Sequence, residues 1–204
     1  NSPDLLDIRP FLWRGWEGRV GYAHYVNVEG NFTERFSKSV RKEVRKASEM
    51  GLHTERLDDA AIHHRLLTQV FARQNLDVPV GENFFSAMLD LFVRKKCGGM
   101  WVTRDKSDNI LGSRIWAWDE KKAYAWSAAS NQDFRDSGAN QFLFVDLLEK
   151  MKKEGLHQVN IMHGNTKRLS YHAAGYNPTL VPYYSVSNNC TMMRILKCIR
   201  IYRG

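Results

Sequence analysis

The sequence is poor in cysteine and proline and has no long hydrophobic run. It holds three cysteines (Cys97, Cys190 and Cys198) and five prolines in 204 residues. An odd number of cysteines without metal-ligand spacing excludes a disulfide framework and a zinc motif, and favours reduced thiols. No apolar run reaches the roughly 18 residues of a membrane-spanning helix, and the N-terminus lacks a signal-peptide pattern. We therefore expect a cytoplasmic protein with no transmembrane segment and no metal; peripheral contact with the inner face of the membrane is the alternative location.

Acidic residues are outnumbered by basic ones. Thirty Lys and Arg against 22 Asp and Glu give a net charge of +8 at pH 7, and the isoelectric point is about 9.5. This excess implies an anionic partner, for which a nucleic acid, a nucleotide cofactor and an acidic membrane face all qualify. A hydrophobic content of 43% supports a packed core. Because the sequence starts at Asn1 without an initiator Met, we expect a fragment or a processed form.

A strongly basic helix is predicted over residues 32–50. Its apolar stripe is formed by Phe32, Phe36, Val40, Val44 and Ala47. Its other face carries Arg35, Lys38, Arg41, Lys42, Arg45 and Lys46. Two interpretations of this face stay open, an ordinary solvated face and a contact strip for a polyanion such as tRNA. The basic amphipathic tail, 188–204, likewise either docks on the rest of the protein or contacts anionic lipid reversibly.

The middle of the chain changes from helical to alternating periodicity. Helices are predicted over 58–74 and 83–96, and His63 and His64 on the first of them are predicted to be ordinary surface residues. Strands are then predicted over 100–104, 110–118 and 123–130, forming an antiparallel meander. Four tryptophans in these strands are interpreted as sheet packing; they are Trp101, Trp116, Trp118 and Trp126.

The stretch 131–155 organises the chain. A polar turn, 131–140, leads into an amphipathic helix that ends at Gly155, and strands precede and follow it at 123–129 and 158–162. Gly138 and its small neighbours leave the backbone N–H groups of the first helical turn accessible, which suits a phosphate. The pattern therefore outlines a cofactor site. A short helix over 165–174 and a last strand over 179–186 complete the prediction.

This order of elements resembles the GNAT acyltransferase fold. Arg135 and Gly138 match the motif that opens the central helix of the family, whereas Asn140 stands where the family has Gly or Ala. Tyr171, Gly175 and Tyr176 match a second motif, a tyrosine five residues before an aromatic that follows a glycine. The resemblance implies an α+β fold, with a mixed, mainly antiparallel sheet flanked by helices.

Within this superfamily, residues 38–47 and 180–186 resemble the Fem-related branch. That branch includes aminoacyl-tRNA-dependent peptidyltransferases of cell-wall synthesis and polysaccharide-associated acyltransferases. The resemblance implies a GNAT-like domain over 52–187, with residues 1–51 as the end of a preceding GNAT-like domain and 188–204 as the tail. His172 and Ala173 replace the Phe-Lys pair of Fem-type enzymes, and Asn160 an acidic residue. These departures count against the Fem-type activity.

The resemblance also implies an activity, the transfer of an acyl group from acyl-CoA, in the simplest case acetyl-CoA, to an amine. The amine must lose its proton, the carbonyl oxygen needs a hydrogen-bond donor, and the departing thiolate benefits from a proton. Tyr171 is the expected general acid and His163 the candidate base, with a loop histidine that caps a backbone group as the alternative for His163. The resemblance further implies that the strands before and after the turn splay apart, around 128–130 and 162–164, so that the backbone N–H near Ala129 holds the thioester carbonyl. The residues expected to hold the cofactor are Ala129, Ser130, Arg135, Asp136, Ser137, Gly138, Ala139, Asn140 and Asn165.

Two other functions stay open. One is a transferase that uses aminoacyl-tRNA as the donor and adds amino acids to a cell-wall precursor. The other is a non-catalytic lobe that binds an anionic polymer or docks to a partner. The acceptor would accordingly be a small molecule or a cell-wall or polysaccharide precursor, and tRNA would contact the basic helix at 35–46.

Overall fold

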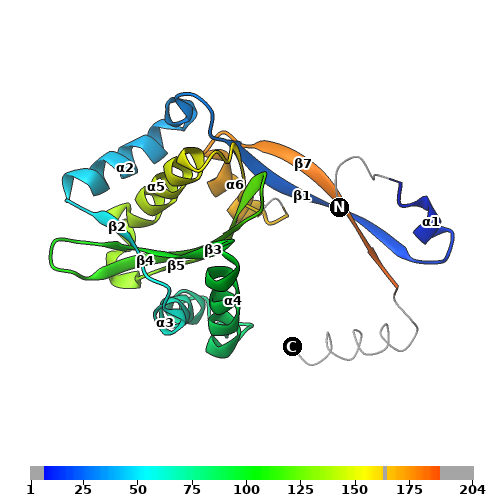
Figure 1. The fold of residues 1–204 in the computed structure, drawn as a ribbon, viewed down its shortest axis with the longest axis horizontal. Coiled ribbons are helices and arrows are strands. Elements are labelled where there is room, and N and C mark those ends of the chain that lie inside the picture. Colours follow the sequence, from blue (N-terminus) through cyan, green and yellow to red (C-terminus); the bar gives the residue numbers. More distant parts are fainter. Residues whose placement is uncertain (1–6, 163–164, 189–204) are drawn as a thin grey trace.

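The computed structural model describes residues 7–162 and 165–188, which form a seven-stranded sheet with helices on both faces (Figure 1). The strand order is β2-β3-β4-β5-β6-β1-β7, and every neighbouring pair is antiparallel except β5 and β6, which are parallel. The strands are β1 (Glu17–Asn27), β2 (His53–Arg56), β3 (Gly98–Arg104), β4 (Ile110–Trp118), β5 (Lys122–Ser130), β6 (Gln158–Asn160) and β7 (Thr179–Ser187). The predicted meander and the mixed, mainly antiparallel sheet are therefore confirmed.

Helices cover the two faces of the sheet unequally. They are α1 (Arg9–Leu12), α2 (Lys38–Glu49), α3 (Ala60–Ala72), α4 (Glu82–Lys95), α5 (Ala139–Lys153) and α6 (Lys167–Ala174). In Figure 1, α3 and α4 lie on one face, below β3 to β5, and α2, α5 and α6 lie on the other. The central helix α5 is amphipathic as predicted: Leu143, Leu147 and Leu148 are fully buried. None of the described helices is both long and apolar enough to span a bilayer.

The single helix predicted over 32–50 is wrong at its start. Residues Phe32–Arg35 form a 3-10 turn, and α2 begins only at Lys38. Ser37 causes the break because its Oγ accepts a hydrogen bond from the N–H of Val40 at 3.3 Å, which makes it the N-cap of α2. The apolar stripe is nevertheless on the inside, and the basic side chains of α2 are exposed.

The prediction that His63 is a surface residue is wrong as well. His63 is fully buried, with Nδ1 2.9 Å from Ser113 Oγ on β4 and Nε2 2.8 Å from Ser127 Oγ on β5. Burial, with a smaller effect from His64, lowers the pKa of His63 to about 4. The signal was available, because His63 precedes the buried residues Leu66 and Leu67 by three and four positions and so shares their helix face.

The tryptophans pack as predicted. Trp116 is fully buried and Trp101 is 7% exposed. Trp118 and Trp126 are half-buried and pack against the two main hydrophobic clusters. These rings are core material of the sheet, and none of them forms an exposed platform for bases.

Strand β1 is part of the same sheet as residues 52–187. It pairs with β6 on one side and with β7 on the other, and the β1–β7 pair extends away from α2 and α5 toward α1 (Figure 1). The boundary at residue 52 and the origin of 1–51 in a preceding domain stay predictions. The tail beyond Asn188 lies outside the described residues.

Candidate functional site

The parallel strands β5 and β6 separate after three residue pairs. Lys122 pairs with Gln158, Ala123 with Val159 and Tyr124 with Asn160, and beyond this point the sheet is split. A β-bulge lies just past the separation. Ser127 faces Ile115 and Ala125 faces Trp116, so Trp126 is an extra residue on β5. A bulge bends and twists its strand, which turns β5 away from β6.

The other edge of the split is marked by Met162. This residue follows β6, is 42% exposed and has a φ of 63°, a left-handed conformation that is strained for a side chain such as Met. Its N–H donates to Asn160 Oδ1 at 2.7 Å, so the last residue of β6 holds the turn in place. Strain of this kind clusters at functional sites.

A backbone donor of β5 points into the split. The N–H of Asn131 donates to the carbonyl of Leu111 at 2.9 Å, which fixes the alternation of the β4–β5 ladder. By that alternation the N–H of Ala129 points to β4, and the N–H of Ala128 points to the split. Ala128 is exposed and Ala129 is 2% exposed. Of these two residues Ala128 is therefore the one whose N–H points to the split, and the role expected near Ala129 stays a prediction.

The start of α5 is packed against α2. Gly138 has a φ of 75°, and a Cβ added there would lie 2.5 Å from the carbonyl oxygen of Glu43. Ser137, Gly138 and Ala139 are all buried, and the N–H of Ala139 donates to Ser137 Oγ at 3.2 Å. Glycine is needed here both for its conformation and for the close approach of α2.

The exposed part of the turn lies at Asp136, just before the buried residues Ser137 to Ala139. Asp136 is exposed, and its carbonyl accepts a hydrogen bond from Lys46 Nζ at 2.6 Å. The backbone of Arg135 lies in the 3-10 segment Gln132–Ser137 that precedes Gly138. Asn140 is half-buried, and its Oδ1 has no hydrogen-bond partner among the described residues. An anion at this turn would meet Lys46 and the backbone around Asp136.

A small cavity of about 60 Å³ lies beside the split, on the face covered by α5 and α6. Its lining is formed by Arg114, Ala125, Ala128, Phe144, Ile161, Leu169, His172, Ala173 and Tyr176. The guanidinium carbon of Arg114 lies 4.7 Å from the centre of the Phe144 ring. Neither Arg114 Nε nor the hydroxyl of Tyr176, both sealed from solvent, has a hydrogen-bond partner in the described part of the chain.

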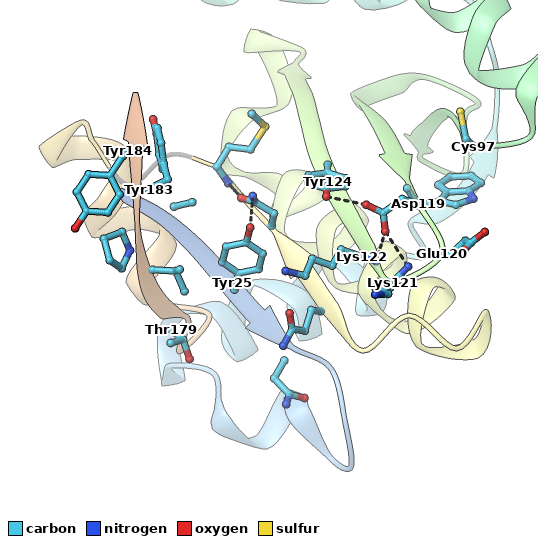
Figure 2. Close-up of a pocket in the computed structure, with 18 of the residues that line it drawn as sticks. Tyr25, Cys97, Asp119, Glu120, Lys121, Lys122, Tyr124, Thr179, Tyr183 and Tyr184 are labelled. Atoms are coloured by element: carbon cyan, nitrogen blue, oxygen red, sulfur yellow. Dashed lines mark hydrogen bonds between the residues drawn. The ribbon is translucent and has the colours of Figure 1, made fainter. Parts of the chain in front are cut away.

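A much larger groove, of about 1520 Å³, opens on the opposite face and reaches the split at Tyr124 and Asn160 (Figure 2). Asp119 accepts hydrogen bonds there from the Tyr124 hydroxyl at 2.9 Å and from the N–H groups of Lys121 and Lys122. Burial together with Asp119 raises the pKa of Tyr124 to about 12. Burial would raise the pKa of Asp119, but the hydrogen bonds from Lys121, Tyr124 and Lys122 outweigh it and lower this pKa.

The groove also holds a second polar pair. Asn160 Nδ2 donates to the hydroxyl of Tyr25 at 3.0 Å, and Lys122 Nζ lies 5.0 Å from the centre of the Tyr25 ring. Figure 2 shows Tyr25 with Lys122 on one side and Tyr183 and Tyr184 of β7 on the other. In the sequence, Asp119 was visible only as a turn residue, and nothing indicated that Tyr25 would line the same groove.

The residues predicted to carry the chemistry have different positions. His163 lies outside the described residues. Tyr171 is 86% exposed on α6. Asn165 accepts a hydrogen bond from the N–H of Tyr22 at 2.7 Å and donates to the hydroxyl of Tyr183 at 3.0 Å, so its side chain joins β1 to β7. Ser130 is half-buried at the end of β5. The roles of these residues stay predictions.

Sequence reasoning missed Arg114 and Tyr176 as a pair. Arg114 is a basic residue within an otherwise uncharged strand, which was the one available signal. Tyr176 was noted only as a motif anchor. Among the described residues no cluster of three His, Cys, Asp or Glu side chains could hold a metal ion.

Comparisons with solved structures support the fold. The chain is similar to FemX, with a TM-score of 0.71 and 11% identity over 87% of this chain and 63% of FemX. It is also similar to the C-terminal domain of a putative lysylphosphatidylglycerol synthetase from Agrobacterium fabrum, with a TM-score of 0.63 and 17% identity over 98% of this chain and 70% of that one. L-PGS from Bacillus licheniformis gives a TM-score of 0.62 and 14% identity over 95% and 69% of the two chains. The chain thus spans less than two thirds of FemX.

No curated protein matches the sequence. The family model of the acetyltransferase (GNAT) domain matches residues 34–176, which is more than half of the chain. This match includes β5, the split, α5 and α6. The protein therefore belongs to the GNAT acetyltransferase family.

Proposed function

We propose that this protein is an N-acyltransferase that moves an acyl group from acyl-CoA, in the simplest case acetyl-CoA, to an amine. The observation that carries the proposal is the split between β5 and β6, with a small cavity on one face of the sheet and a large groove on the other. A donor and an acceptor that approach from opposite faces would meet at the split. The family supports the reaction class.

The donor is assigned to the cavity face. Acyl-CoA supplies an acyl group activated as a thioester. The N–H of Ala128 is the proposed hydrogen-bond donor to the thioester carbonyl, where negative charge develops during attack by the amine. Lys46 and the backbone around Asp136 are the proposed contacts of the pyrophosphate. Two buried side-chain donors without a hydrogen-bond partner among the described residues, Arg114 Nε and the Tyr176 hydroxyl, fit a ligand that offers oxygen acceptors.

The acceptor amine is assigned to the groove. Asp119 is ionised at neutral pH and attracts a cationic amine, which must lose a proton before it attacks. In the reaction a C–N bond forms and the C–S bond breaks. His163 is the proposed base for the amine proton, and Tyr171 is the proposed acid that gives a proton to the departing sulfur.

The basic face of α2 favours a second candidate, an aminoacyl-tRNA-dependent transferase. Lys38, Arg41 and Lys42 are exposed, and no described residue forms an ion pair with them. A tRNA contact through such residues would weaken steeply as the salt concentration rises, whereas recognition of CoA by a few backbone groups would depend weakly on salt.

A thermal-shift experiment separates these candidates. We expect acetyl-CoA and CoA to raise the melting temperature at both low and high salt, because a ligand that binds only the folded state stabilises it. A shift with bulk tRNA alone that disappears at high salt would favour the tRNA-dependent enzyme. In that case Lys38→Gln/Arg41→Gln would abolish the shift, and the matched control Arg94→Gln/Lys95→Gln on α4 would not.

Turnover tests the third possibility, a non-catalytic lobe. Tyr171→Phe in an enzyme would lower kcat and leave the affinity for acyl-CoA unchanged, since only a proton donor is lost. A binding module would show no turnover and no effect of this variant on affinity.

A further inference from the structure

We propose that Arg114 and Tyr176 form a carboxylate-binding subsite, so that the acyl group this protein transfers carries a distal negative charge, as in a dicarboxylic acyl thioester such as succinyl-CoA. The inference rests on the proposed function and goes beyond it, because it assigns the class of acyl group.

The first observation is the missing partner of Arg114. This side chain is partly buried, its Nε is sealed from solvent without a hydrogen bond, and its Nη2 makes only a long contact of 3.4 Å to the carbonyl of Asn140. No described carboxylate pairs with it, and none lines the cavity. Burial lowers the pKa of Arg114. A buried cation without a counter-ion is costly, so an anion is expected where this charge is used.

The second observation is a matching donor in the lining of the same cavity. Tyr176 is 3% exposed, and its hydroxyl has no partner among the described residues. Burial raises its pKa to about 12, so the hydroxyl keeps its proton at neutral pH. Both groups can therefore donate, and the ligand between them must accept. Phe144, Ile161 and Leu169 make the rest of the cavity apolar, which strengthens such hydrogen bonds.

The third observation is the position of Arg114 relative to the split. Arg114 is directly opposite Ala128 in the β4–β5 ladder, and residues so paired have Cβ atoms about 5 Å apart. A thioester carbonyl held by the N–H of Ala128 would place the next few atoms of the acyl chain beside the guanidinium. An acetyl group has no acceptor beyond its carbonyl oxygen and would leave both donors unsatisfied. A carboxylate would accept from both, and arginine suits it because its planar fork can donate two parallel hydrogen bonds.

The test compares the affinities of CoA, acetyl-CoA and succinyl-CoA by calorimetry. For the unaltered protein we expect succinyl-CoA to bind about tenfold or more tightly than acetyl-CoA, the gain typical of a hydrogen bond to a charged group. In Arg114→Gln the ratio of the two Kd values should fall to about one, and in Tyr176→Phe it should fall by about threefold. Arg94→Gln on α4 removes the same charge far from the cavity and should leave the ratio unchanged.

The outcomes are distinct. Equal binding of acetyl-CoA and succinyl-CoA by the unaltered protein would overturn the inference and leave the acyltransferase proposal standing. Failure of all three compounds to bind would overturn the proposed function itself, and the inference with it. If Arg114→Gln weakens the binding of all three compounds equally, Arg114 contacts the CoA part that they share, which would overturn the inference. Tyr176→Phe keeps the ring in place, so it decides the question if Arg114→Gln does not fold.

Discussion

Ser127 and Ala128 are neighbours on β5 but face opposite sides of the sheet. The buried polar groups beside Ser127 are hydrogen-bonded, whereas two buried polar atoms beside Ala128 lack partners among the described residues. On the side of α3 and α4, Ser127 contacts His63, and both ring nitrogens of His63 are hydrogen-bonded. On the side of α5 and α6, Ala128 lies beside Arg114 and Tyr176, and neither Arg114 Nε nor the Tyr176 hydroxyl has a hydrogen-bond partner in the described part of the chain. Buried polar groups in folded proteins are almost always satisfied. The satisfied cluster is therefore structural, and the unsatisfied pair marks a place for a ligand.

The most direct way to break this comparison is to remove the polar group from each side. His63→Leu should lower the free energy of unfolding by about 3 kcal/mol, because the buried hydroxyls of Ser113 and Ser127 lose their partner. Arg114→Met should leave the free energy of unfolding unchanged or raise it, because a buried cation without a counter-ion is removed. Urea denaturation measures both. If Arg114→Met destabilises the protein as much as His63→Leu does, Arg114 is a structural residue.

Acid should lower the free energy of unfolding through His63, on the side of the sheet where the buried polar groups are hydrogen-bonded. His63 binds a proton near pH 4 in the folded state and near its ordinary pKa of 6.5 when unfolded. Between these values the unfolded state holds more protons, so stability falls as the pH falls. From pH 7 to pH 4.5 this histidine should cost about 2 kcal/mol of unfolding free energy.

Denaturation at the two pH values tests this loss. The loss should be about 2 kcal/mol smaller in His63→Gln, which cannot gain a charge. The half-buried His64 supplies the control, and His64→Gln should keep most of the loss, because burial is the larger cause of the lowered pKa of His63 and His64 the smaller one. The same loss in His63→Gln would show that other groups cause it.

Local patterns were sufficient for most of the elements. The strand 110–118 was predicted to the residue because its apolar run is bounded by polar turns on both sides. The predicted helix 32–50 is wrong at Ser37, which caps the start of α2. The apolar stripe continues across this break, so periodicity alone could not reveal it. The inward position of His63 could have been read from its spacing to Leu66.

The site could be predicted only in part. The split of β5 from β6 came from the resemblance, and the alternation of backbone groups that separates Ala128 from Ala129 depends on the register with β4. The meeting of Arg114 with Tyr176 depends on the packing of α5 and α6 over the split, which is a long-range property of the fold. Asp119 and Tyr25 line the same groove because β1 pairs with β6, far from its place in the sequence.

The smallest expected effect on the free energy of unfolding comes from removing a single hydroxyl on either side of the sheet. Ser127→Ala should lower the free energy of unfolding by about 1 kcal/mol, because Nε2 of the buried His63 loses its hydrogen bond. Tyr176→Phe should change it by less than about 0.5 kcal/mol, because its hydroxyl gives up no hydrogen bond to a described residue. The two variants each remove one oxygen atom, from the half-buried Ser127 and from the buried Tyr176, and a urea titration measures the difference in their free energies of unfolding. A loss of about 1 kcal/mol in Tyr176→Phe would mean that the hydroxyl already has a partner in the protein, and the cavity would then offer a ligand only the guanidinium of Arg114.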